Sequence, residues 1–272
     1  MPVKDTDKPL GFRDIAESLT LTSEGWKAEI CEGWKQGRTV YGGLSAALAL
    51  EAVFRNHSDL PPLRSANIGF IGPVTDNPVY KTEVLRQGRN VVTIEAKGYV
   101  DEAVVITVTF AFGASRESIL DVNCPMPEAK SPALYEAYTP EQIRAFVPNF
   151  FHNFDTRLVE GSRPVTGADK GYIRTWSRHF DTASREGISS LFCIADVLPP
   201  AAMPVLTQPG PVSSMTWMFN VLSDNPETED GWWQIESDLT AAKNGYSSQI
   251  MRIWNSQGEL VVEGVQSVTV FV

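Results

Sequence analysis

The chain has 272 residues, which is enough for one large domain or for two smaller domains with separate hydrophobic cores. Hydrophobic residues make up 43% of the sequence and charged residues 21%, a composition that excludes disordered, collagen-like and disulfide-scaffold proteins. Thirty-three acidic residues against 23 basic ones give a formal net charge of −10. Since this charge repels phosphate backbones and no basic run offsets it, we expect no nucleic-acid partner.

Neither a membrane span nor a secretion signal is expected. The apolar runs at 39–50 and 103–114 are too short to cross a bilayer, and the N-terminus mixes acids with bases. The three cysteines lie far apart without a C-x-x-C, and the three histidines show no ligand spacing. The sequence therefore predicts a reduced, cytoplasmic protein without metal, cofactor or membrane contact.

The first half of the chain predicts one helix followed by antiparallel strands. An aromatic-rich strand candidate at 26–34 precedes a helix over about 43–56, whose sequence LSAALALEAVF is apolar on every face. Strand-like stretches follow at 65–74, 79–86, 91–100 and 103–112, separated by turn residues such as those at 87–90. A helix that is apolar all round must be enclosed, so we expect the strands to cover it.

A proline-rich segment divides the sequence near its midpoint. Residues 123–140 hold four prolines and show little periodicity, which is typical of a connecting segment. We therefore expect an N-terminal domain at 1–122, a linker at 123–146 and a C-terminal domain at 147–272.

The second half repeats the order of the first. A strand candidate at 172–178 precedes a helix over about 184–198 that stops at two prolines, and strands are expected at 213–222, 232–238, 247–255 and 260–272. Residues 65–78 also align without a gap with residues 213–226, sharing Ser, Asp, Asn and Pro. This self-similarity predicts two copies of one unit, an antiparallel sheet around a buried helix.

Several short segments resemble the double hot-dog acyl-CoA thioesterases, a family related to bacterial acyl-CoA thioesterase II and the peroxisomal enzymes. They are Tyr41-Gly42-Gly43 with its small-residue helix, the hairpin at 86–89, Ala195-Asp196 and Gln266. The resemblance runs from about residue 28 to the C-terminus. It implies an α+β tandem hot-dog fold, two antiparallel sheets each wrapped around a central helix. It also implies hydrolysis of acyl-CoA to free acid and CoA.

Glycines open the first predicted helix. The N–H groups of Gly42 and Gly43 would lie at the positive end of the helix dipole, which suits a developing oxyanion. Glycines there would also let a helix enter a crowded sheet, but the resemblance favours function, with Tyr41 and Gly42 in substrate binding. The second helix begins with charged residues at 185–186 and is the poorer oxyanion site.

Ser45 lies in a sequence close to the G-x-S-x-G elbow of serine hydrolases. The final glycine of that motif is absent, and residues 36–40 are too short and polar for the buried strand that an elbow requires. We therefore expect Ser45 to pack inside the helix rather than act as a nucleophile.

Polar side chains of the second half are the candidates for activating water. Alternation in the last strand places Gln266 on the face of Gly264 and Val268, and the resemblance puts it at the family's water-holding glutamine. Asp238 and Thr240 are expected where a strand meets the following turn, near the family's threonine or serine, and Asp238 is the nearest carboxylate to act as base. A core hydrogen bond for Gln266 and a strand-end cap for Asp238 and Thr240 are the structural alternatives.

The sequence departs from the family at one acidic position. The resemblance implies an aspartate in the strand after the second helix, where residues 211–217 contain no acid. Asp196 is an alternative base, because an isolated carboxylate inside an apolar helix is costly without donors. A structural role before Pro199 and Pro200 is its competing interpretation.

Arg86 and Arg89 flank a tight turn, where cations would meet the phosphates of coenzyme A, although exposed hairpin arginines are commonly just solvated. Two other functions compete with the thioesterase: a non-catalytic acyl-CoA binding protein and a hot-dog enoyl-CoA hydratase. The hydratase pairs a histidine with a carboxylate, and His57 and His152 have no obvious partner.

The candidate residues predict one site per chain. The glycine pair opens only the first helix, whereas Asp238, Thr240 and Gln266 belong to the sheet of the second half. We expect these parts to combine into one site that binds one acyl-CoA. Exposed sheet edges leave homo-oligomerisation open.

Overall fold

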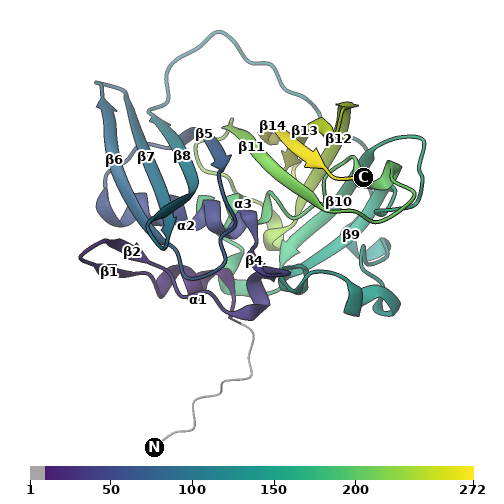
Figure 1. Ribbon diagram of the computed structural model, residues 1–272. Coiled ribbons are helices and arrows are strands. Elements are labelled where there is room, and N and C mark those ends of the chain that lie inside the picture. Colours follow the sequence, from purple (N-terminus) through teal and green to yellow (C-terminus); the bar gives the residue numbers. More distant parts are fainter. Residues whose placement is uncertain (1–9) are drawn as a thin grey trace, which may run out of the picture.

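Strands from both halves pair into one antiparallel sheet in the computed structural model, which describes residues 10–272 (Figure 1). The strands are β1 (Thr20–Thr22), β2 (Gly25–Lys27), β5 (Leu63–Phe70), β6 (Val79–Gln87), β7 (Val91–Val100), β8 (Ala103–Gly113), β9 (Phe154–Gly161), β10 (Tyr172–His179), β11 (Val212–Val221), β12 (Trp233–Lys243), β13 (Tyr246–Trp254) and β14 (Leu260–Val270). Their order in the 12-stranded sheet is β1-β2-β6-β7-β8-β5-β11-β14-β13-β12-β10-β9. A separate small hairpin is formed by β3 (Lys35–Gln36) and β4 (Thr39–Val40).

The two halves join through β5 and β11. These strands pair antiparallel from Ser65 opposite Asn220 to Gly69 opposite Thr216. Each would otherwise be an edge strand with unpaired N–H and C=O groups, and their pairing satisfies both edges. The two predicted hot-dog sheets are therefore continuous, and β14 of the second half comes close to the helix of the first.

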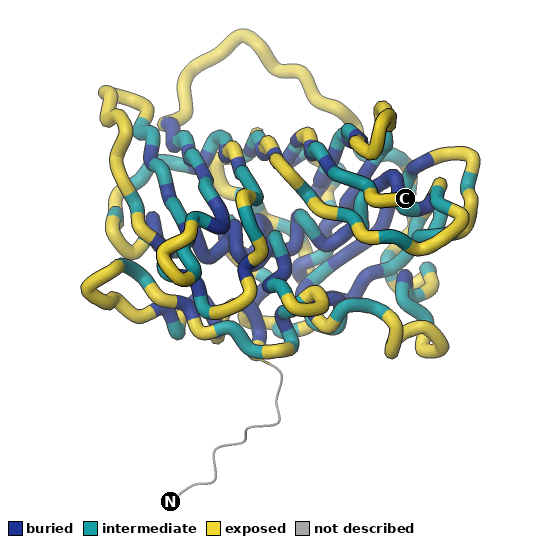
Figure 2. Tube along the Cα trace, viewed as in Figure 1, coloured by how far each residue is buried: buried dark blue, intermediate teal, exposed yellow. Residues whose placement is uncertain are grey.

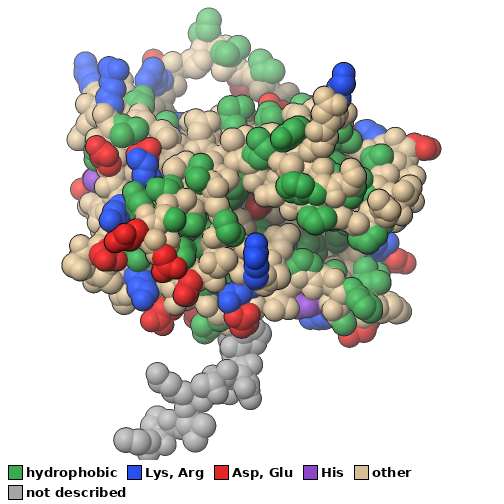
Figure 3. Space-filling view, in the orientation of Figure 1, with side chains coloured by type: hydrophobic (Ala, Val, Ile, Leu, Met, Phe, Trp, Pro, Cys, Tyr) green, Lys and Arg blue, Asp and Glu red, His purple; other side chains and the backbone are tan. Residues whose placement is uncertain are grey.

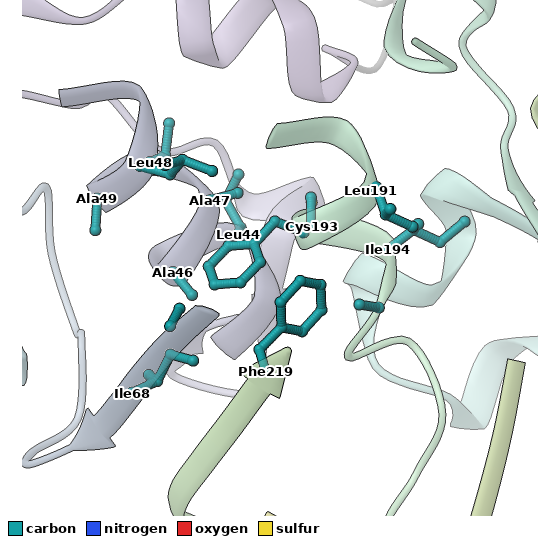
Figure 4. Packing of buried hydrophobic residues seen from close by; sticks show 14 of the residues in the cluster. Leu44, Ala46, Ala47, Leu48, Ala49, Ile68, Leu191, Cys193, Ile194 and Phe219 are labelled. Carbon is teal, nitrogen blue, oxygen red and sulfur yellow. The ribbon is translucent and has the colours of Figure 1, made fainter. Parts of the chain in front are cut away.

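Two buried helices lie inside the curve of the sheet, α2 (Gly42–Asn56) and α3 (Ile188–Ile194), while α1 (Phe12–Glu17) packs beside them. Figure 4 shows Leu44 and Ala47 of α2 facing Cys193 of α3, with Ile68 of β5 and Phe219 of β11 against them. The small side chains of α2 let the helices approach closely, and each fully buried leucine contributes about 1.5–3 kcal/mol. This packing confirms that the apolar first helix is enclosed.

Several predicted elements have different bounds in the structure, and the strand expected at 65–74 is β5, which ends at Phe70. Of the strand expected at 26–34 only β2 forms, and the end of that segment is the 3₁₀ helix η1 (Glu32–Trp34). The helix expected at 184–198 is reduced to α3: Gly187, at a positive φ of 87°, delays its start to Ile188, and the helix ends at Ile194. The strand expected to end at 238 continues to Lys243, and Asn244 and Gly245, both at positive φ, form the turn.

The connection between the halves forms an exposed arch. Residues 114–131 contain no helix or strand and are mostly exposed (Figure 2). Trp254 Nε1 and Trp176 Nε1 donate hydrogen bonds to the carbonyls of Cys124 and Lys130, which hold the arch against the second half. The chain then forms η2 (Pro132–Leu134), η3 (Glu141–Phe146) and η4 (Asn149–Asn153) before β9 begins.

Charged side chains are unevenly spread over the face shown in Figure 3. Acidic and basic groups gather over the first half, near β1, β2 and α1, whereas hydrophobic and uncharged groups dominate over the second half. Within residues 10–272 no helix is both long and apolar enough to span a membrane. All three cysteines are free.

Candidate active site

A cavity of about 1060 Å³ lies at the N-terminus of α2, with walls from both halves of the chain. Most of its lining is apolar, including Phe70, Val74, Phe150, Leu198 and Met203. The polar groups in the wall include Gln36, Arg38, Thr39, Tyr41, Ser45, Arg163, Asp196, Ser214 and Gln266. Among the described residues that line the cavity, Asp196 is the only carboxylate and there is no histidine.

Asp196 lies just after α3, and its carboxylate meets the first turn of α2. Gln266 Nε2 donates to Asp196 Oδ1 over 3.0 Å, and the backbone N–H of Gly43 also donates to this carboxylate. A Cβ on Gly42 would lie 2.9 Å from Asp196 Oδ2, so the second oxygen faces the start of the helix. Negative charge is stabilised at this end of the helix dipole.

Burial raises the pKa of Asp196 to about 7, while the hydrogen bonds from Gln266 and Gly43 lower it. Burial is the larger effect because a carboxylate loses hydration in the enclosed wall. A carboxyl group with a pKa near neutrality is suited to general base catalysis, since both of its protonation states are accessible.

Gln266 is held in place from the next strand. It is buried in β14, and its Oε1 accepts a hydrogen bond from Gln249 Nε2 of β13 over 2.7 Å. Gln249 Oε1 in turn accepts the backbone N–H of Ala201 over 2.7 Å. Gln249 was not among the residues predicted for the site, although it belongs to the alternating buried residues of β13 (Ser247, Gln249, Met251 and Ile253), a pattern that the sequence contains.

Tyr41 and Gly43 both contact α3. The Tyr41 hydroxyl donates to the carbonyl of Cys193 over 2.8 Å, and its ring stacks on Phe150 with centroids 4.1 Å apart. A Cβ on Gly43 would lie 2.4 Å from Cys193 O and 2.6 Å from the Tyr41 hydroxyl. Gly43 therefore permits close helix packing, and its N–H is used by Asp196. The N–H of Gly42, the first residue of α2, has no partner within the helix and is the donor left for an oxyanion.

Replacing Gly43 by alanine is expected to destabilise the protein by about 1–3 kcal/mol, because the new methyl group would overlap the Cys193 carbonyl. Urea denaturation measures the change. Gly33→Ala is the matched control, since a Cβ there would meet only Cys31 Sγ at 3.9 Å. Equal stability of the two variants would show that close helix approach does not require glycine at position 43.

The structure does not bring Asp238 or Thr240 to the cavity. Both lie within β12, which is separated from β14 by β13, and not at a turn as expected. Asp238 forms an ion pair with Lys170 over 3.6 Å, and the Thr240 hydroxyl donates to the carbonyl of Ser248. The carboxylate of the cavity is Asp196 instead, because the sheet order places β12 away from β14, whereas Asp196 follows α3 beside the start of α2.

Arg86 and Arg89 also lie away from the cavity. They are exposed at the end of β6 and in the turn before β7, strands that β8 and β5 separate from β11. The cations in the cavity wall are Arg38, exposed between β3 and β4, and Arg163, whose Nε donates to the carbonyl of Tyr138. Neither arginine could be predicted from the sequence, because an isolated arginine in a loop belongs to no recognisable motif.

Ser45 packs inside α2, as the sequence predicts. It is buried, its hydroxyl donates back to the carbonyl of Tyr41, and its own carbonyl accepts from Tyr80. In the second half, α3 corresponds to α2. α1 packs against α3 and against the preceding 3₁₀ turn η5 (Thr182–Ser184), where the N–H of Arg13 donates to Ser184 Oγ. No group of three or more His, Cys, Asp or Glu side chains within residues 10–272 is placed to hold a metal ion.

Both halves match domain families. Residues 30–113 match a family described as the acyl-CoA thioesterase N-terminal domain, and residues 126–270 match the acyl-CoA thioesterase C-terminal domain. A comparison with curated proteins finds no match to this sequence.

Solved structures share the fold at low sequence identity. A conserved hot-dog protein of unknown function from Alicyclobacillus acidocaldarius has a TM-score of 0.84 at 20% identity, over 96% of this chain and 98% of that one. The acyl-CoA thioesterase II TesB2 from Mycobacterium marinum has a TM-score of 0.72 at 17% identity, over 95% and 97%. These similarities confirm the double hot-dog fold. Since the two domain matches together span most of the sequence, the chain belongs to the acyl-CoA thioesterase family.

Proposed function

We propose that the protein hydrolyses acyl-CoA thioesters in the cavity at the start of α2, with Asp196 as the general base. The observation that carries the proposal is the position of Asp196. It is the only carboxylate in the described cavity wall, and it accepts hydrogen bonds from Gln266 and from the first turn of α2. Hydrolysis of thioesters is the reaction for which both matched domains are named.

In the proposed reaction, water binds at Asp196 Oδ2, the carboxylate oxygen that Gln266 leaves free. Asp196 takes a proton as the water oxygen forms a bond to the thioester carbon. The carbonyl oxygen becomes an oxyanion next to the N–H of Gly42, where the helix dipole stabilises it. The carbon–sulfur bond then breaks, and the proton on Asp196 passes to the departing CoA thiolate.

The cavity wall offers different surfaces for the acyl chain and for the CoA part of the substrate. The apolar lining, which includes Phe70, Phe150 and Met203, is suited to the acyl chain. Arg38 lies exposed at the cavity and is the cation that we assign to the phosphates of CoA, in place of Arg86 and Arg89.

A panel of acyl-CoA esters with detection of the free thiol tests the proposed function. We expect turnover with at least one chain length and one acyl-CoA bound per chain. Tight binding of every ester without thiol release would identify an acyl-CoA binding protein instead. Hydration of enoyl-CoA is not expected, because the described cavity wall contains no histidine to pair with Asp196.

The rate of hydrolysis is expected to depend on the ionisation of Asp196. Since burial raises the pKa of this carboxyl group to about 7 and the base must be ionised, kcat/KM should rise with pH through a midpoint near pH 7 and level off above about pH 8. A pH–rate profile between pH 5 and 9, with a substrate that is stable over this range, measures the midpoint. A profile that is flat from about pH 5 upward would assign the base to a carboxyl group with an ordinary pKa.

A further inference from the structure

Three hydrogen bonds in series connect the backbone of Ala201 to the carboxylate of Asp196. The N–H of Ala201 donates to Gln249 Oε1, Gln249 Nε2 donates to Gln266 Oε1, and Gln266 Nε2 donates to Asp196 Oδ1, over 2.7, 2.7 and 3.0 Å. Gln249 and Gln266 lie directly opposite each other in the β13–β14 pair, and both are buried. The series therefore begins inside the protein, and only its last two members, Gln266 and Asp196, border the cavity.

The direction of every bond in this series follows from its first member. A backbone N–H can only donate, so Gln249 must turn its carbonyl oxygen toward Ala201 and its amide nitrogen toward Gln266. Gln266 must then turn its oxygen toward Gln249, which leaves its nitrogen for Asp196. An isolated glutamine amide could be reversed without changing its shape, but this one cannot reverse without placing two donors or two acceptors face to face.

The fixed direction matters for the protonation of Asp196. A protonated carboxyl group needs an acceptor for its O–H, whereas an ionised one needs donors. A freely rotating Gln266 could serve either form, but Gln266 held by Gln249 can only donate. We call this series of hydrogen bonds, from Ala201 through Gln249 and Gln266 to Asp196, the relay. The relay therefore favours the ionised form of Asp196 over the protonated one.

We propose that Gln249 is a positioning residue of the active site, which holds Gln266 in the donor orientation and so keeps Asp196 available as a base. The proposal rests on the proposed function for its catalytic meaning. Gln249 does not line the cavity, so it acts through Gln266 and has no substrate contact of its own.

The other groups that face Asp196 do not replace this effect. Tyr41, the residue before α2, and Cys193 of α3 have raised pKa values because both are buried and lie near the Asp196 charge, and they remain neutral at the pH where Asp196 titrates. The N–H of Gly43 donates to Asp196 whatever the state of Gln249. Arg38 and Arg163 line the same cavity, but neither is among the causes of the raised Asp196 pKa.

The test compares Gln249→Met with Gln234→Met. Gln234 is also a fully buried glutamine, but it lies in β12 and accepts from Arg174 Nη1, away from the cavity. In Gln249→Met the pKa of Asp196 should rise by about one unit, measured from the pH–rate profile and from the ¹³C shift of its carboxyl carbon. At pH 7 the ionised fraction of Asp196 would then fall from about one half to about one tenth, so kcat should fall about fivefold with little change in KM. Gln234→Met should leave the pKa and kcat unchanged, and an unchanged Asp196 pKa in Gln249→Met would overturn the proposal.

A double-mutant cycle with Gln266→Ala distinguishes a positioning role of Gln249 from a general contribution to the fold. If Gln249 acts through Gln266, adding Gln249→Met to Gln266→Ala should lower kcat by less than about twofold further. Full additivity of the two losses would show that Gln249 supports the fold only.

Two measurements keep this proposal separate from the proposed function. The ¹³C titration of Asp196 needs no turnover, so it tests the relay even if the wild-type protein releases no thiol. If Gln249→Met does not fold, the side-chain amide signals of the wild-type protein serve instead. We expect slow solvent exchange of the Gln249 amide protons and a Gln266 amide shift that follows the titration of Asp196, and fast exchange with no such shift would refute the relay.

Discussion

Asp196→Asn is expected to lower kcat for acyl-CoA hydrolysis by at least about 100-fold, because a positioned general base contributes roughly 10²- to 10⁴-fold. Asparagine keeps the size of the side chain and can still accept the hydrogen bond from Gln266, so acyl-CoA affinity should change little. Free-thiol release gives kcat, and calorimetric titration with a slowly hydrolysed acyl-CoA analogue gives the affinity.

Asp238→Asn is the matched control for this change. Asp238 is partly exposed and paired with Lys170, so its replacement should alter kcat by less than about twofold, as expected for an exposed ion pair. If Asp238→Asn abolished turnover and Asp196→Asn did not, the base would be Asp238 and the cavity would need to be reassigned.

Asp196→Asn should also change the stability of the protein in a defined pH range. The folded pKa of Asp196, about 7, lies above the value of about 3.9 for an unfolded aspartate. The folded state therefore binds more protons between these values, and the free energy of unfolding falls as pH rises through this range. Asparagine does not ionise, so Asp196→Asn should be no less stable than wild type at pH 8. Thermal unfolding at pH 5 and pH 8 checks this sign.

Gln266→Ala is expected to lower kcat by at least tenfold while the protein remains folded. The change removes the donor to Asp196 Oδ1 and leaves Gln249 Nε2 without its acceptor, and a tenfold loss corresponds to about 1.4 kcal/mol of transition-state stabilisation. Steady-state thiol release measures the loss, and circular dichroism checks the fold.

Gln234→Ala provides the comparison for Gln266→Ala, because it also removes a buried amide from the sheet of the second half. Equal activity of Gln266→Ala and wild type would exclude Gln266 from the site. Equal loss in both glutamine variants would attribute the effect to the sheet and not to the carboxylate.

Local patterns in the sequence predicted much of the fold. The apolar run after Tyr41 predicts α2 to within a residue, and period-two alternation predicts most long strands, because both signals depend on neighbours along the chain. The predicted ends of helices and strands were less accurate where the backbone conformation of a single residue sets the end. Gly187 at positive φ shortens α3, and the Asn244–Gly245 turn extends β12, although Asn-Gly is itself a strong hairpin signal.

The candidate site was only partly predictable. The glycines of α2 and the buried face of Gln266 can be read from the sequence, since helix starts and strand alternation are local features. The sequence by itself thus determined the fold class, the two-fold repeat and one side of the site.

Only the tertiary structure decided which carboxylate reaches that site. Asp196 and Gln266 are 70 positions apart, and Gly43 belongs to the other half of the chain. They meet because α2 packs against α3 at a glycine and because β5 pairs with β11, and the Ala201–Gln249–Gln266 relay depends on the same register. Contacts between distant segments are set by packing and strand pairing across the whole molecule, and a local pattern carries no record of them.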